Sequence, residues 1–129
     1  MNYDQFLAQV RERGEYPSRD EAEQVATAVL EELGRRLTPG EAGDLAAQLP
    51  GPLPHALTAP RQGGAEAVGV EEFCRRVADR TGGRPPTAEW DASAVLSTVA
   101  DSVSGGELNH VLSQLPSGYA PLFGRPGLS

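Results

Sequence analysis

The sequence predicts an all-α protein, a helical bundle built from two tandem three-helix repeats packed as one domain. Apolar residues recur at spacings of three and four, which is typical of helices with one buried face. The same order of helix starts and stops occurs twice along the 129 residues. No window shows the sustained alternation of apolar and polar residues that indicates a half-buried strand.

The repeat appears when the two halves of the chain are aligned by eye. Equivalent positions pair Tyr3 with Val70, Phe6 with Phe73, Leu7 with Cys74, Val10 with Val77, Ala22 with Ala88, Val29 with Val95 and Leu30 with Leu96. We assign repeat one to residues 3–57, a polar linker to 58–69, repeat two to 70–123 and a frayed tail to 124–129. Three helices of this length bury too little apolar surface alone, so we expect both repeats to share one core.

Local stop and start signals place three helices in the first repeat. We predict helices over Tyr3–Arg13, Arg19–Arg36 and Pro39–Leu49, then one further turn over Pro52–Leu57. Gly14 and Pro17 end the first helix, and Pro50 ends the third. Ser18 with Glu21, and Thr38 with Glu41, have the spacing of capping boxes.

The second repeat is predicted to follow the same plan. We expect helices over Val70–Thr81, Ala88–Ser102 and Gly106–Leu115. Tyr119 and Phe123 then take the places of Leu53 and Leu57. Under this assignment all eleven prolines lie outside helix interiors, where a proline would remove a hydrogen bond.

Composition and charge restrict the function classes. The net charge of −7 favours solubility and makes nucleic-acid binding unfavourable, because phosphate attraction needs a basic surface. Cys74 is the single cysteine, so no intramolecular disulfide forms. No apolar run is long enough for a membrane helix, and residues 1–12 lack the regions of a signal peptide. We therefore expect a cytoplasmic protein, and the absence of Lys and Ile suggests a GC-rich, bacterial genome.

The helix-end motifs resemble one bacterial family. The runs are Ala28-Val29-Leu30, then Leu37-Thr38-Pro39-Gly40-Glu41, then Asp44-Leu45-Ala46-Ala47-Gln48-Leu49-Pro50. They are similar to the signature of the domain of unknown function 2267, over about Tyr3 to Phe123. The resemblance implies an all-helical fold, and it implies no activity, cofactor or catalytic residue. The second repeat departs from the pattern, with Ser104-Gly105 in place of Thr-Pro.

One basic cluster, formed by Arg75, Arg76, Arg80 and Arg84, is a candidate anion site. We favour a solvated helix face instead, because Glu71 and Glu72 precede Arg75 and Arg76 by four residues, a favourable order for ion pairs. The Thr/Ser-x-x-Glu turns lead into helix N-termini, where phosphates bind. Glu41 and Glu107 already supply negative charge there, so we interpret these turns as caps.

Other candidate residues also have structural interpretations. Cys74 replaces Leu7 on an apolar stripe, so we interpret it as a buried hydrophobe rather than a nucleophile. His110 is predicted to face solvent, and nothing brings His55 close enough to form a metal site with it. Gln48 and Gln114 either bond to nearby backbone or join the two repeats. Trp90 either packs at the junction between repeats or lies exposed at a partner surface, and we favour the junction.

These observations predict no catalytic, cofactor-binding or metal-ligating residue. The preferred function is a non-enzymatic helical module that binds another protein or a second copy of itself, with no cofactor. The alternative is a small-molecule or lipid-sensing bundle with an apolar cavity between the repeats. An enzyme ranks third, since acid and base chemistry needs titratable groups that converge in a pocket.

Overall fold

The computed structural model describes residues 1–59 and 65–125, and these residues are helical with no strand among them. The all-α prediction is therefore confirmed. The helices are α1 (Tyr3–Gly14), α2 (Arg19–Arg36), α3 (Pro39–Ala46), α4 (Leu53–Leu57), α5 (Val70–Thr81), α6 (Pro85–Ser102), α7 (Gly105–Gln114) and the 3-10 helix η1 (Ser117–Phe123). The predicted linker and tail fall partly on residues 60–64 and 126–129, outside the described ranges.

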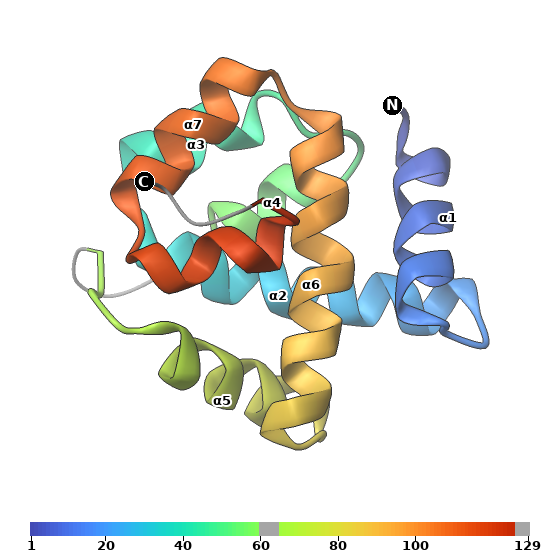
Figure 1. The fold of residues 1–129 in the computed structure, drawn as a ribbon. Coiled ribbons are helices and arrows are strands. Elements are labelled where there is room, and N and C mark those ends of the chain that lie inside the picture. The colour runs from blue at the N-terminus through green and yellow to red at the C-terminus, as the bar shows by residue number, and fades with distance from the viewer. Residues whose placement is uncertain (60–64, 126–129) are drawn as a thin grey trace.

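The helices of the N-terminal half (α1–α4) pack on those of the C-terminal half (α5–η1). Helix α1 contacts both α2 and α6, and α5 contacts both α6 and α2. Each long helix also has a short one on it, α4 on α2 and η1 on α6, while α3 meets α7. Figure 1 shows α1 at the side of α6, and α5 near the opposite end of the molecule from α3 and α7. Every helix therefore has a partner in its own half, and α1, α2, α3, α5, α6 and α7 have one in the other half too.

The capping residues explain where the helices begin. Thr38 and Glu41 form the predicted box in both directions. Ser18 accepts a hydrogen bond from the backbone N–H of Glu21, but no return bond from the Glu21 side chain is found among the described residues, so that box is half formed. Helix α1 has a full box made by Asn2, which the sequence analysis missed because Gln5 replaces the usual acid.

Two helix boundaries differ from the predictions by three residues, and the other differences are of one residue. Helix α3 ends at Ala46 rather than Leu49, since the backbone N–H groups of Gln48 and Leu49 bond three residues back, in a tighter turn before Pro50. Helix α6 begins at Pro85 rather than Ala88. Prolines are tolerated in the first turn, where the missing N–H has no intrahelical partner. The proline prediction is also wrong at one position, because Pro121 lies inside η1.

One cluster of buried side chains contains residues from all eight helices. Phe6 and Phe73 are fully buried in it, as are Val29 and Val95 at equivalent places on α2 and α6. Leu53 and Leu57 of α4 face inward, as predicted. In η1 their predicted counterparts, Tyr119 and Phe123, are also buried, and the Tyr119 ring meets the Phe73 ring edge-on with centroids 5.3 Å apart. The largest side chains of both halves therefore share one core.

We predict that Phe6→Ala and Phe73→Ala each lower the free energy of unfolding of the whole chain by about 3–5 kcal/mol, the usual cost of an emptied aromatic site. This is a large part of the ~5–15 kcal/mol that stabilises a small domain. Urea unfolding followed by circular dichroism and by Trp90 fluorescence should give coincident midpoints in both variants. Two resolved transitions in either variant would contradict a shared core.

Candidate functional site

The arginine cluster is largely exposed, as the sequence suggested, and three of its members also form ion pairs with glutamates. Arg76 pairs with Glu72 as predicted, with 3.3 Å between Nε and Oε2, and its Nη1 also lies 2.9 Å from Oε2 of Glu66. Arg75 pairs with Glu72 at 2.6 Å, not with Glu71. Glu72 can pair with both arginines because it lies three residues before Arg75 and four before Arg76 on the helix surface.

Arg80 crosses from α5 to α2. Its Nε lies 2.7 Å from Oε1 of Glu32, and its Nη1 is 3.8 Å from Glu31. Arg80 is nevertheless an exposed residue, in agreement with the solvated-face interpretation, and Arg76 is half-buried. The ion pairs of Arg76 with Glu66 and of Arg80 with Glu32 were not predicted from the sequence. Arg84 precedes α6, is exposed, and has no ion-pair partner in the described part of the chain.

A buried ion pair anchors this network. The Arg36 side chain is only 1% exposed, and its Nη2 lies 3.3 Å from Glu66 and 3.6 Å from Glu32. Burial lowers the pKa of Arg36, and the two glutamates oppose that shift. The Glu66 backbone N–H also donates to the Arg35 carbonyl at 2.9 Å. Glutamates therefore match the buried arginines, and the cluster joins α2, α5 and the segment before α5.

A groove with mainly apolar walls opens in the C-terminal half between α5, the start of α6 and η1. Its volume is about 630 Å³. The lining residues are Val70, Glu71, Cys74, Arg75, Pro85, Pro86, Glu89, Gly118, Pro121 and Leu122. Cys74 is buried at the groove's base, as predicted, and burial raises the pKa of its thiol to about 11. Such a thiol is a poor nucleophile at neutral pH.

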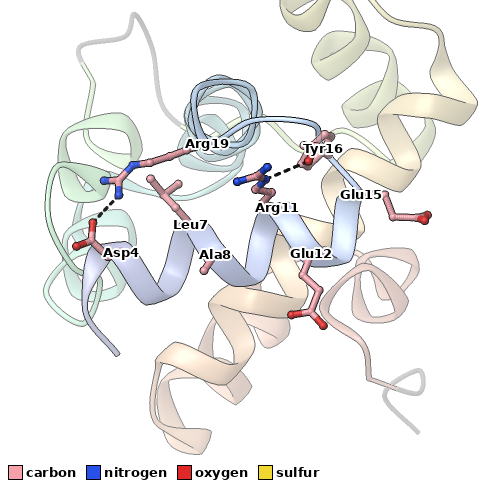
Figure 2. Close-up of a pocket in the computed structure, with 8 residues that line it drawn as sticks. All are labelled: Asp4, Leu7, Ala8, Arg11, Glu12, Glu15, Tyr16 and Arg19. Atoms are coloured by element: carbon pink, nitrogen blue, oxygen red, sulfur yellow. Dashed lines mark hydrogen bonds and ion pairs between the residues drawn. The ribbon is translucent and has the colours of Figure 1, made fainter.

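The N-terminal half has a pocket of about 410 Å³ beside α1 (Figure 2), lined by Asp4, Leu7, Ala8, Arg11, Glu12, Glu15, Tyr16 and Arg19. Figure 2 shows Arg19 reaching from the start of α2 to Asp4 of α1, with 2.7 Å between Nη1 and Oδ1. The Arg19 guanidinium also lies over the Tyr3 ring, 5.7 Å from its centroid. Val70, which the sequence alignment pairs with Tyr3, lines the groove of the C-terminal half.

A polar pocket of about 310 Å³ lies where the two halves meet. On one side Tyr16 donates a hydrogen bond from its hydroxyl to Oδ1 of Asp91, at 2.5 Å. Burial raises the pKa of the Asp91 carboxyl, and nearby Glu21 adds to the shift. Neither Tyr16 nor Asp91 was singled out from the sequence. A signal existed, because Asp91 stands among Ala88, Ala92 and Val95 on the buried stripe of its helix.

Trp90 lies at the junction between the two halves, as favoured from the sequence, and it is exposed there. Its indole N–H donates to the Gly14 carbonyl at 3.0 Å, a contact between the two halves. Trp90 is nevertheless 51% exposed. Trp90 therefore marks the junction at the surface and not in the core.

The two glutamines differ in role. Oε1 of Gln48 accepts a hydrogen bond at 2.8 Å from the backbone N–H of Ser104, which caps α7 in the other half. Gln114 instead donates to the neighbouring Ser113 hydroxyl. His110 is exposed, as predicted, and so is His55. Within residues 1–59 and 65–125, no three His, Cys, Asp or Glu side chains gather in a way that could hold a metal ion.

The comparisons with known proteins identify the class to which this helical fold belongs. The family model described as "Uncharacterized conserved protein (DUF2267)" matches residues 3–122. The chain therefore belongs to the DUF2267 family. Among curated proteins, none matches the chain. In the described ranges, no helix has both the length and the apolar character needed to cross a membrane.

We predict that Glu32→Gln lowers the free energy of unfolding by about 3 kcal/mol, because it leaves the buried Arg36 short of a counter-charge. Glu71→Gln is the matched control, and its exposed side chain should change stability by at most ~0.5 kcal/mol. Urea unfolding at neutral pH measures both. Equal stability of the two variants would show that the buried pair is not stabilising.

Cys74 should react slowly in the native protein. With a pKa near 11 rather than 9.0, its thiolate fraction at pH 7 falls about a hundredfold, and burial slows access further. Labelling by a chromogenic disulfide reagent should therefore be at least ~100-fold slower in buffer than in urea, and it should accelerate as the pH rises towards 11. Rapid native labelling at pH 7 would contradict this.

Proposed function

We propose that the protein is a non-enzymatic binding module, and that its groove between α5, the start of α6 and η1 accepts an apolar segment of a partner protein. This proposal rests on the groove, which has a volume of about 630 Å³ and is open to solvent. Pro85, Pro86 and Pro121 offer no backbone N–H to a ligand. Apolar side chains from a partner therefore suit this groove better than a small polar molecule does.

Charge defines the partner further. Glu71 and Glu89 are exposed among the groove's lining residues, and no cationic side chain of the described chain pairs with either. Arg75, the groove's one arginine, is paired with Glu72. The protein as a whole carries −7. A segment that has basic residues beside its apolar ones complements this site, whereas a second copy of the chain would bring the same negative charge.

We also propose that the two halves are tandem repeats related by an approximate two-fold exchange. Helices α1 and α5 each have twelve residues, and α2 and α6 each have eighteen. The contacts exchange in the same way: α1 with α6 corresponds to α5 with α2, and α4 on α2 corresponds to η1 on α6. Each half then has a pocket beside its first helix, of about 410 Å³ in the N-terminal half and about 630 Å³ in the C-terminal half.

The proposal assigns no catalysis and a cytoplasmic location. The titratable Cys74 in the groove has a raised pKa, and neither His nor Cys lines the polar pocket beside Asp91. A free, reduced thiol is ordinary in the cytoplasm. The alternative of a lipid sensor with an apolar cavity between the halves receives less support, because the pocket between them is lined by Glu21, Arg80 and Asp91.

The proposal can be tested with two fluorescent model peptides, an amphipathic Leu/Lys helix and a Leu/Glu helix of equal length. Fluorescence anisotropy should show saturable binding of the Leu/Lys peptide only. Val70→Arg should weaken that binding at least ~10-fold, which is about 1.4 kcal/mol. Ala47→Arg is the matched control, because it adds the same charge at an exposed position at the end of α3, outside the groove.

If both arginine variants weaken binding equally, the peptide is attracted by net charge alone and the groove is not the site. Light scattering over a range of concentrations tests whether a second copy of the chain occupies the groove. We expect a monomer, and a dimer that Val70→Arg disrupts would show that a second copy fills the groove.

A further inference from the structure

The pocket between the two halves is separate from the proposed docking groove, and most of its lining residues are polar or charged. It is lined by Tyr16 from the loop after α1, by Glu21, Gln24 and Val25 of α2, by Arg80, Thr81, Gly82 and Gly83 at the end of α5, and by Thr87 and Asp91 of α6. It is therefore built by both halves. Its volume of about 310 Å³ is on the order of ten water volumes at ~30 Å³ each, which suits a small organic molecule.

Asp91 is a fixed, buried carboxylate in this pocket. The residue is only 5% exposed. The Tyr16 hydroxyl holds Oδ1 in place at 2.5 Å, while Oδ2 accepts no hydrogen bond from the described residues. No arginine or histidine of the described chain forms an ion pair with Asp91. A buried carboxylate without a counter-ion is costly, and a bound cation would remove that cost.

The other charges near the pocket leave it negative. Glu21 is exposed on the pocket wall and interacts with Asp91 as a like charge. Arg80 also lines the pocket, but its guanidinium is engaged by Glu32 at 2.7 Å and by Glu31 at 3.8 Å. The positive charge of Arg80 is therefore already matched, and the two carboxylates facing the pocket are not.

We propose that this pocket binds a small alkyl diamine, with one ammonium group on Asp91 and the other near Glu21. An ammonium has three donors, and the Gln24 amide oxygen and the Thr87 hydroxyl are further acceptors on the wall. Val25 provides apolar surface for the carbon chain. A metal ion is a poorer fit, because the described residues contain no group of three or more ligating side chains.

The test uses the full-length protein and three probes with the same four-carbon chain: 1,4-diaminobutane, n-butylamine and 1,4-butanediol. Isothermal titration calorimetry at neutral pH and 0.15 M NaCl should show saturable binding of the diamine, at least ~10-fold weaker binding of the monoamine, and none of the diol. Asp91→Asn keeps an acceptor for Tyr16 and removes the charge, so it should weaken diamine binding at least ~10-fold. Glu21→Gln, at an exposed position, should weaken it as well.

Glu89→Gln is the control, because it removes a carboxylate from the docking groove and should leave diamine affinity unchanged. Circular dichroism checks that each variant is folded. The proposal is overturned if the diol binds as well as the diamine, if Glu21→Gln and Glu89→Gln behave alike, or if millimolar diamine shows no saturable binding. None of these outcomes bears on peptide docking, since Val70→Arg tests a different surface.

Discussion

The exchange of helix contacts between the halves is the constraint on which the rest of the structure depends. Helix α1 packs on α6 as well as α2, and α5 packs on α2 as well as α6. Each half alone would leave one side of its long helix exposed, since α2 and α6 bury residues on more than one face. The shared core follows from this arrangement, and so do the polar contacts at its edges.

The same exchange positions the polar contacts between the halves. It brings Arg80 to Glu32, Trp90 to the Gly14 carbonyl, and Tyr16 to Asp91. The pocket between the halves exists because a loop of one half meets the long helix of the other. The groove has a different origin, since it lies within the C-terminal half. There it lies beside Val70, and the smaller pocket of the N-terminal half lies beside α1 and Arg19.

Two charged residues of the core show how stability and site formation are linked. Glu32 and Asp91 both lie on buried helix faces, where an unpaired charge is costly. Glu32 is matched by Arg36 and Arg80, and it serves the fold. Asp91 is matched only by a tyrosine hydroxyl, so its carboxylate remains able to bind a cation. Equal burial thus gives a structural role in one case and a candidate binding role in the other.

The sequence by itself determined the local features of this protein. Caps such as Thr38 with Glu41, and the stripes that bury Phe6 and Phe73, depend on residues a few positions apart, so spacing alone predicted them. The sequence also contained a signal of buried charge that the predictions did not use: Glu32 and Asp91 interrupt apolar stripes. Only the tertiary structure decided their partners. Asp91 meets Tyr16 across 75 positions and Glu32 meets Arg80 across 48, and such pairs depend on how helices dock, which no local spacing specifies.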